Sequence, residues 1–491
     1  MMRLSEQTLD RLQPAVERPG YDRRAVAAGV VHLGIGAFHR AHQADVLDRA
    51  LAGGDLRWGI RGASLRSPGV RDQLGPQDGL YSLVVREGSE TRVRVIGAVR
   101  DVLVAPESPT AVIEALAAPE TRLATLTITE KGYRLDPASG ALMIEDPDVA
   151  ADLMSLDAPR TAPGFLVAAL ARRRERGLPA LSVISCDNLP HNGTRIRDAV
   201  LAIATRYDPL LADWIAETAA FPQTMIDRIV PATTAADIDR LGIELGVEDH
   251  GMVKTEPFLQ WVIEDRFAGE RPEFEALGVE VTQDVAAWED AKLRLLNGAH
   301  SALAYLGGLA GFRFMHEVVA QPVFAAYLDR LWDEAAETLT PPPGLDIRTY
   351  RAELARRFAN PALEHRTAQI AMDGSQKLPQ RLLASCADRV TKGQRLPALS
   401  LAVAAWMRWQ EGRDEAGDPH VVDDPLAAQT HRLVLDHPEL LERGAALLSL
   451  RAVFPANLAE NPHFSGPVLD AYRRLSTRGA LGAAMAAGGA P

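Results

Sequence analysis

The stretch that decides the fold is Val30-Val31-His32-Leu33-Gly34-Ile35-Gly36-Ala37-Phe38-His39-Arg40. Its apolar run ends in two closely spaced glycines, and residues at helical spacing follow it as far as Leu51. This layout predicts a buried strand over Val30–Gly36, a tight turn, and a helix over Phe38–Leu51. Gly34 permits the turn, and Gly36 lets a pyrophosphate approach the backbone at a helix N-terminus.

The cofactor prediction rests on this turn and on its position near the start of the chain. A glycine pair also occurs in α/β turns that bind nothing, and the usual third glycine is replaced by His39. The next predicted strand, Trp58–Ser64, lacks the acidic residue that commonly binds the adenosine ribose, so charge does not separate NAD from NADP. The predicted cofactor-binding residues of the turn are Gly34, Ile35, Gly36, Ala37, Phe38, His39 and Arg40.

Strands and helices alternate up to about residue 285, and helices dominate after it. The predicted elements of the first part are strands over Leu123–Thr129 and Leu181–Cys186, an antiparallel pair over Tyr81–Arg86 and Val93–Val99, and a helix over Val167–Glu175. The predicted helices of the second part are Lys292–Leu309, Val319–Glu337, Thr349–Arg357, Gln376–Ala387, Pro397–Glu411, Pro425–Asp436 and Glu439–Leu447. We therefore predict an α/β dinucleotide-binding domain over residues 1–285 and a mostly α-helical substrate domain over residues 286–491.

Composition excludes several classes of protein. The net charge is −12 with no basic run, which argues against nucleic acid as a partner. Cys186 and Cys386 are the only cysteines, too few for a disulfide framework or a four-cysteine zinc site. The polar N-terminus and the absence of an apolar run of about 20 residues argue against export and membrane insertion. We expect a cytoplasmic protein with no metal site, since His39 and His42 lack a ligand partner at convincing spacing.

The most informative stretch is Lys292-Leu293-Arg294-Leu295-Leu296-Asn297-Gly298-Ala299-His300-Ser301. On a helix, Lys292, Asn297 and His300 fall within roughly 140° of arc. A desolvated lysine is a suitable base for a hydroxyl proton, while an amide and an imidazole can hold the resulting oxygen. Each residue alone also suits a solvated or packed helix, but Asn-Gly inside an apolar helix is a local violation expected mainly at functional sites.

Polar residues also follow predicted strands. Asn188, after Leu181–Cys186, is a candidate donor to a substrate oxygen, with helix capping as an equal alternative. Glu130 has the same position after Leu123–Thr129. Asp227 and Arg228 stand between apolar residues, where an ion pair at a strand edge is the alternative. In the helical part, Arg366, Lys377 and Arg381 are candidates for binding a substrate carboxylate or hydroxyls, against a solvated helix face.

Taken together, these segments resemble the mannitol dehydrogenase family of polyol-specific long-chain dehydrogenases. The resemblance runs from about His32 to Asn461 and rests on separated motifs in the same order. The motifs are Gly34–Gln43, Thr127–Tyr133, Ser185–Asn188, Phe221–Pro231, Glu256–Asp265, Lys292–Ser301 and Asp373–Pro379.

The resemblance implies a Rossmann-type N-terminal domain, a helical C-terminal domain and NAD-linked, metal-independent chemistry in a monomer or small homo-oligomer. It places the catalytic lysine on Lys292, the two oxygen-holding asparagines on Asn188 and Asn297, and the positioning histidine on His300. It further implies that Glu130 gates proton exit, that Asp227 organises the cofactor site, and that Lys377 binds substrate.

Within the family, Thr129–Tyr133 and the segment from His365 to Arg381 are most similar to fructuronate reductase, whose substrate pair is D-mannonate and D-fructuronate. Met2–Ser5 and Asn188–Gly193 are instead similar to mannitol 2-dehydrogenase, which leaves D-mannitol and D-fructose as the alternative. Two other classes stay open: a non-catalytic protein that binds NAD and a sugar, and an epimerase that uses NAD transiently. Neither would consume NADH.

Overall fold

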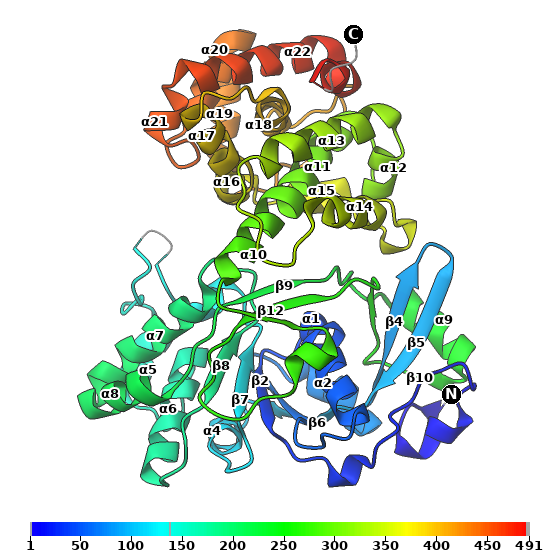
Figure 1. The fold of residues 1–491 in the computed structure, drawn as a ribbon, viewed down its shortest axis with the longest axis vertical. Helices are drawn as coiled ribbons and strands as arrows, with labels where there is room; N and C mark the ends of the chain where they lie inside the picture. The colour runs from blue at the N-terminus through cyan, green and yellow to red at the C-terminus, as the bar shows by residue number, and fades with distance from the viewer. Residues whose placement is uncertain (1, 137–138, 488–491) are drawn as a thin grey trace. The chain divides into compact units, whose positions relative to one another are not determined.

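The computed structural model describes residues 2–136 and 139–487. The chain divides into two compact units, unit 1 (Met1–Val285) and unit 2 (Ala286–Pro491). Every strand of the described residues lies in unit 1, and unit 2 is built from helices (Figure 1). The predicted fold class, an α/β N-terminal part followed by a mostly helical C-terminal part, is confirmed.

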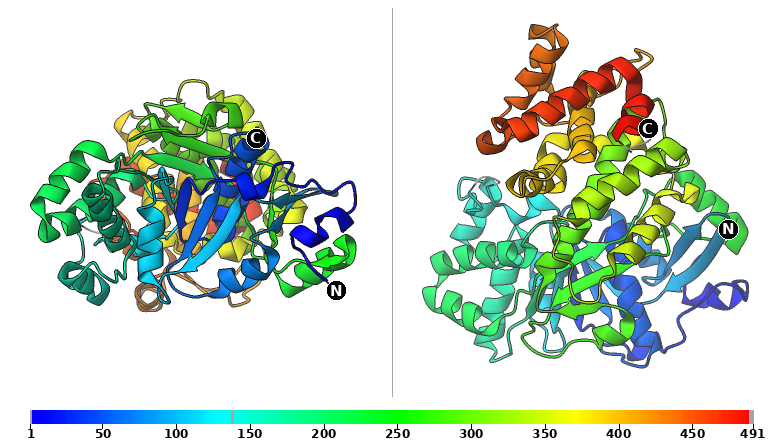
Figure 2. Two further views of the ribbon diagram at one scale, coloured as in Figure 1. Left: turned by 90° about the horizontal axis from the view of Figure 1, so that it is seen from below. Right: turned by 45° about the horizontal axis from the view of Figure 1, so that its top comes forward.

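The main sheet of unit 1 has five parallel strands (Figure 2, left). They are β2 (Val30–Leu33), β3 (Ile60–Ser64), β6 (Val99–Val104), β7 (Leu123–Leu126) and β8 (Ser182–Ser185), in the spatial order β6-β3-β2-β7-β8. Counted along the chain, this is the 3-2-1-4-5 order of a Rossmann sheet, in which the order reverses at the first strand. The ligand crevice of such a sheet opens beyond the carboxyl end of that strand, which here is the Gly34 turn.

Successive residues of β2 are shared between two hydrophobic cores, as a sheet covered on both faces requires. Val31 and Leu33 pack with α4 (Pro109–Leu116), α6 (Ala162–Glu175) and α7 (Asn192–Tyr207). Val30 packs into the second core with α2 (Gln43–Ala52) and the strands of the smaller sheets. This explains why the strand reads as a continuous apolar run interrupted only by His32.

The strands predicted over Val30–Gly36 and Leu123–Thr129 end earlier, at Leu33 and Leu126, and two other predicted elements of unit 1 are wrong. The single helix predicted over Phe38–Leu51 is broken at His42 into α1 (Ala37–Ala41) and α2, because His42 leaves helical geometry and its Nε2 donates to the carbonyl of Gln260 at 3.0 Å. The predicted strand Val93–Val99 ends at Ile96, and Val99 begins the unpredicted β6. β6 lies at the edge of the sheet, where charged residues such as Arg100 and Asp101 are tolerated. These charges are the reason that the sequence pattern did not predict a strand there.

Unit 1 also contains two three-stranded sheets and a two-stranded sheet of β1 (Met2–Arg3) and β10 (Val247–Glu248). β4 (Tyr81–Glu87) and β5 (Glu90–Ile96) form the predicted antiparallel pair, with β11 (Val253–Thr255) beside β4. β9 (Thr224–Asp227) runs antiparallel to β12 (Gln260–Glu264), next to β13 (Glu280–Thr282). The remaining elements are α3 (Gly69–Leu74), α5 (Pro147–Met154), α8 (Pro209–Thr218) and α9 (Ala235–Leu245).

Unit 2 is centred on two almost fully buried helices, α11 (Gly298–Leu309) and α18 (Pro397–Trp409). The others are α10 (Val285–Ala291), α12 (Met315–Val319), α13 (Pro322–Ala336), α14 (Ile347–Phe358), α15 (Thr367–Ala371), α16 (Gly374–Leu378), α17 (Ala384–Thr391), α19 (Ala427–Asp436), α20 (Leu440–Leu448), α21 (Ala456–Ala459) and α22 (Pro462–Ala487). α22 packs on α18 and was not predicted, because Pro467 and the kink at Gly479 interrupt its pattern. Two π-helical turns, Lys292–Asn297 and Pro379–Leu383, interrupt the α-helices.

Candidate active site

The glycine turn after β2 is in close contact with Thr127, the residue that follows β7. Gly34 adopts φ of +91°, and a Cβ at this position would lie 2.2 Å from the carbonyl oxygen of Thr127. The backbone conformation and the space therefore both require glycine. Gly36 differs, because a Cβ there would meet nothing closer than the Gly34 oxygen at 3.8 Å.

The backbone at Gly36 is open to the approach of another group, because an added Cβ would meet only the Gly34 oxygen, at 3.8 Å. Gly36 is the residue before the first turn of α1, whose first residues are Ala37 and Phe38. The leading N–H groups of a helix have no partner within the helix, so they are available to an anion. Ile35 is buried beneath the turn and packs into the second core. The turn thus combines room with donors, as the binding of a dinucleotide requires.

His39 and Arg40 lie inside the fold rather than on the open side of the turn. The His39 ring stacks on His32 with centroids 3.4 Å apart, and within the described chain neither ring nitrogen has a hydrogen-bond partner. The Arg40 guanidinium donates to the carbonyls of Gly251 and Gly36. Both side chains are buried, so they are not available to a ligand at the turn.

His32 is a residue whose role the sequence did not reveal. The Thr127 hydroxyl donates to the Gly34 carbonyl at 2.9 Å, and it accepts from His32 Nε2 at 2.8 Å. His32 Nδ1 then accepts from the Thr125 hydroxyl at 2.7 Å. Burial lowers the pKa of His32 to about 3, which keeps the ring neutral. A neutral ring can donate through Nε2 and accept at Nδ1. The threonines at alternate positions, Thr125 in β7 and Thr127 just after it, were the available signal.

Asp227 is buried at the end of β9, opposite Gln260 of β12. The ion pair of its neighbour Arg228 is with Asp45, at 2.9 Å and with both side chains 1% exposed. Arg228 also donates to the carbonyls of Ala41 and Glu256. Arg228 therefore ties β9 to the α1–α2 junction, next to the glycine turn.

The strand ends that carry Glu130 and Asn188 lie level with this turn. The register aligns Leu33, Leu126 and Ser185 across β2, β7 and β8. Asn188 and Glu130 follow these strands and are both exposed. Sequence reasoning offered helix capping as the other role for this segment, but the buried Asp187 accepts from Ile128 N and Thr129 N in the turn after β7. Unit 1 thus brings the glycine turn, Glu130 and Asn188 to one edge of its sheet.

In unit 2, Lys292 and Asn297 begin and end one π-helical turn. The turn closes with a hydrogen bond from Gly298 N to Leu293 O, five residues back. This wider turn brings residues five apart closer to one line than an α-helix does, and π-turns are frequent at functional sites. Lys292 is 6% exposed, and Asn297 and His300 are each 9% exposed. The three side chains predicted to act together are thus buried on one continuous segment.

Two polar atoms of this segment lack a partner within the described residues, Asn297 Nδ2 and His300 Nε2. Buried polar groups are nearly always hydrogen-bonded, so such atoms indicate a site completed by a ligand or water. His300 stacks on Phe358, and its ring centroid lies 4.7 Å from that of His365. Burial, with the charges of His365 and Arg381, lowers the pKa of His300 well below its usual range, and burial lowers that of His365 to about 4. Both rings are neutral at pH 7, and His365 is a neighbour that sequence reasoning did not single out.

The predicted substrate-binding cations are placed differently. Lys377 lies on α16, with Nζ donating to the Met372 carbonyl at 2.5 Å. Arg381 lies on the second π-turn, donates to Ser301 Oγ at 3.1 Å, and has its pKa lowered to about 10 by burial. Among the described residues Arg381 has no acidic partner. Both cations lower the pKa of His300, whereas Arg366 is exposed at the start of α15.

The two π-turns touch at Gly298, which explains the Asn-Gly pair inside the helix. A Cβ at Gly298 would lie 2.6 Å from the backbone oxygen of Arg381. We expect Gly298→Ala to lower the free energy of unfolding by about 1–3 kcal/mol, because neither backbone can move freely. The matched control is Gly466→Ala in α22, where a Cβ would meet nothing within 4 Å. That change should be neutral or stabilise by up to about 1 kcal/mol. Denaturant unfolding distinguishes the two, and equal values would contradict the packing role.

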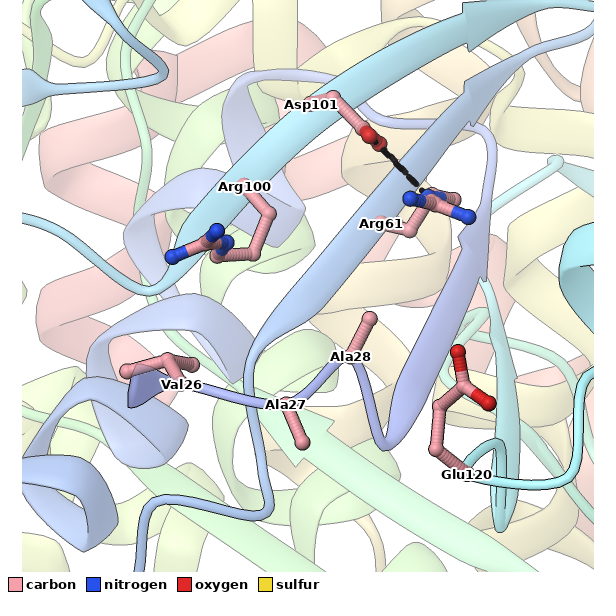
Figure 3. A pocket seen from close by; sticks show the side chains of 7 residues that line it. All are labelled: Val26, Ala27, Ala28, Arg61, Arg100, Asp101 and Glu120. Carbon is pink, nitrogen blue, oxygen red and sulfur yellow. Dashed lines mark hydrogen bonds and ion pairs between the residues drawn. The ribbon is translucent and has the colours of Figure 1, made fainter. Parts of the chain in front are cut away.

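A separate pocket of about 370 Å³ lies at the opposite edge of the main sheet (Figure 3). Its lining residues are Val26, Ala27, Ala28, Arg61, Arg100, Asp101 and Glu120. They precede or begin the parallel strands, and Arg61 pairs with Asp101 at 2.9 Å. The pocket therefore lies at the amino ends of the strands and is distinct from the glycine turn.

Within the described chain, no helix has the length and apolar character needed to cross a bilayer. Nor do three or more His, Cys, Asp or Glu side chains gather into a potential metal cluster in residues 2–136 and 139–487.

Comparison with known proteins identifies both halves of the chain. Residues 28–276 match the model of the mannitol dehydrogenase Rossmann domain, and residues 284–476 match that of the mannitol dehydrogenase C-terminal domain. The chain is 45% identical to the uncharacterized oxidoreductase YeiQ of Escherichia coli, across 95% of this chain and 96% of that protein. It is 42% identical to D-mannonate oxidoreductase of Escherichia coli, across 95% and 96%.

A solved structure agrees with these matches. Mannitol 2-dehydrogenase of Pseudomonas fluorescens, in a ternary complex with NAD and D-mannitol, superimposes with a TM-score of 0.86 at 39% identity, covering 98% of this chain and 99% of that one. The resemblance inferred from the separated motifs is thus confirmed over nearly the whole chain. The chain belongs to the mannitol dehydrogenase family of oxidoreductases, which act on CH–OH groups.

Proposed function

We propose that this protein is an NAD-dependent, metal-independent dehydrogenase that interconverts a secondary hydroxyl and a ketone on a sugar acid, with D-mannonate and D-fructuronate as the substrate pair. The proposal rests on the Lys292–His300 segment. In it, the buried Asn297 Nδ2 and His300 Nε2 have no hydrogen-bond partner among the described residues. A substrate oxygen would satisfy both atoms.

In the oxidative direction, neutral Lys292 takes the proton of the substrate hydroxyl. Asn297 and His300 hold the oxygen as it becomes a carbonyl, and Asn188 is proposed as a further donor to it. The Gly34–Arg40 turn would hold NAD, with Asp227 organising its site, and the bound cofactor would provide the acceptor for the hydride of the carbinol carbon. Glu130 is proposed to pass the proton from Lys292 to solvent. Reduction runs the same steps backwards, with protonated Lys292 as the acid.

The direct test is absorbance at the NADH band with D-fructuronate, D-tagaturonate, D-fructose, D-mannitol and D-arabinitol, each with NAD(H) and NADP(H). We expect turnover with NADH and D-fructuronate. A protein that only binds NAD and a sugar would show none, and an epimerase would convert the sugar without net consumption of NADH.

The choice of a sugar acid rests on the buried guanidinium of Arg381, which among the described residues has no carboxylate partner. A substrate carboxylate would supply one, with Lys377 as a second cation. We expect Arg381→Met to raise KM for D-fructuronate by roughly 10–100-fold, as loss of a charged hydrogen bond implies. KM for a neutral ketose should change less than about threefold. Equal losses on both substrates would instead assign Arg381 to the packing of Ser301.

Mannitol 2-dehydrogenase activity is the second candidate. The similarity to the Pseudomonas fluorescens enzyme favours it, as does the likeness of Asn188–Gly193 to that subfamily. Faster reduction of D-fructose than of D-fructuronate in the panel would select this alternative.

A further inference from the structure

The carboxylate of Asp187 joins two turns that carry proposed catalytic residues. It follows β8 and is 8% exposed. One oxygen accepts from Thr129 N at 2.8 Å, and the other accepts from Ile128 N at 3.1 Å and from the Tyr133 hydroxyl at 2.8 Å. All three donors belong to the segment after β7 that contains Glu130. One buried side chain from the β8 end thus holds the turn of the neighbouring strand.

That turn contains a backbone conformation that needs such support. Thr129 adopts φ of +63° and ψ of 168°, which a β-branched residue rarely adopts. Strained conformations persist only where the surrounding structure enforces them, and they cluster at functional sites. The next residue, Glu130, begins a short 3₁₀ helix that ends at Tyr133. The direction in which Glu130 leaves the sheet therefore depends on the bonds that Asp187 accepts.

Asp187 is itself anchored from the other side. Its carbonyl accepts from Asn192 Nδ2 at 3.1 Å. The same amide group donates to the Thr224 carbonyl at 2.9 Å, and its oxygen accepts from Thr224 N at 3.0 Å. Asn188, the proposed donor to the substrate oxygen, lies between Asp187 and Asn192 in the chain. Asp187 is thus joined through Asn192 to β9 and through its own carboxylate to the turn after β7.

We propose that Asp187 is a positioning residue for the dehydrogenase reaction: it fixes Glu130 and Asn188 relative to each other at the carboxyl edge of the sheet. The proposal rests on the proposed function, in which Asn188 donates to the substrate oxygen and Glu130 passes the proton on. Asp187 itself is not assigned a contact with substrate or cofactor.

The test variant is Asp187→Asn, which keeps the size of the side chain but replaces one accepting oxygen with a donating NH₂ group. That group would face a backbone N–H, so at least one bond to the turn is lost. Tyr133→Phe is the graded variant, because it removes the third donor to Asp187, together with the bond to Ser185 Oγ, and leaves both N–H bonds.

Asp152 provides a matched control in the same unit. It is buried, and it also accepts from two backbone N–H groups and one hydroxyl: Arg160 N at 2.7 Å, Thr161 N at 3.0 Å and Thr161 Oγ1 at 2.6 Å. Burial raises the pKa of both carboxyls, so the two sites share their electrostatic character. Asp152→Asn removes an equivalent structural interaction at the N-terminus of α6.

We expect Asp187→Asn and Asp152→Asn to lower Tm by similar amounts. Only Asp187→Asn should lower kcat, by roughly 10–100-fold, because displacement of a catalytic group by about 1 Å can cost that much. KM for NADH should stay within about twofold of wild type in both. Tyr133→Phe should lower kcat by less than about fivefold. Hydrogen exchange followed by mass spectrometry should show faster exchange across residues 127–134 in Asp187→Asn alone.

The outcomes separate the inference from the function it rests on. If wild type reduces none of the sugars in the panel, the proposed function fails. If wild type is active but Asp187→Asn retains kcat like Asp152→Asn, at a matched loss of Tm, the positioning role is overturned. Faster exchange in residues 127–134 together with unchanged kcat also overturns it, because the turn would then be free to move without consequence.

Discussion

Lys292→Ala should remove nearly all turnover, lowering kcat by roughly 10²–10⁴-fold, while NADH binds with near-wild-type affinity. The range is the usual contribution of a general acid–base group. Lys292 lies in unit 2 on the π-turn and is 6% exposed, whereas the residues proposed for the cofactor lie in unit 1. Loss of the amine should therefore affect the proton transfer and not the nucleotide. The measurements are kcat with the preferred sugar and the Kd of NADH by fluorescence.

A surface lysine provides the control for this change. Lys392 donates to the carbonyl of Glu337 on an exposed helix end, and Lys392→Ala should leave kcat unchanged. Added methylamine should restore part of the activity of Lys292→Ala and none to any other variant. Retention of more than about a tenth of the wild-type kcat would be too much for an essential acid–base group.

Gly36→Val should abolish cofactor binding without unfolding the protein. The backbone at Gly36 has φ of −109° and ψ of −170°, which valine adopts readily, and its side chain would enter the open space before α1. We expect the Kd of NADH to rise by more than about 100-fold, or about 2.7 kcal/mol. The free energy of unfolding should change by no more than about 1 kcal/mol. Titration of NADH and denaturant unfolding measure the two quantities.

Gly34→Ala should show the opposite pattern and serves as the comparison. Its positive φ and the Thr127 oxygen at 2.2 Å both oppose a Cβ, so we expect a loss of about 3 kcal/mol or more in stability. If Gly36→Val binds NADH as wild type does, the phosphate does not lie against this residue. If it unfolds instead, the space in front of Gly36 is not free.

Much of the main sheet could be predicted from the sequence, because the local hydrophobic pattern agrees with the fold in that part of the chain. The apolar run before Gly34 predicted β2, and the polar residues after Leu126 and Ser185 predicted the functional edge of the sheet. What failed depends on contacts made elsewhere. The break at His42 requires the Gln260 carbonyl, which is distant in sequence, and β6 was hidden by charges that an edge strand tolerates.

The candidate site residues likewise divide into those that local sequence pattern indicated and those that depend on contacts distant in sequence. The position of Asn297 and Gly298 inside an apolar helix signalled a site, but no single-sequence pattern distinguishes a π-turn from an α-helix. Asp187 was visible only as a polar residue after a strand, because its partners Ile128 and Thr129 lie about 60 positions earlier in the chain. Hydrogen bonds between the ends of neighbouring strands depend on the order of strands in the sheet. Sequence periodicity does not reveal that order.

The π-turn at Lys292–Asn297 means that this helix contains one residue more than regular winding needs. If the same residues were instead wound as a regular α-helix, each would advance the direction by about 100°. Asn297 would then lie about 140° around the helix axis from Lys292. The irregular winding is therefore what sets the amine in line with the amide, and a smoother helix would be a less useful one.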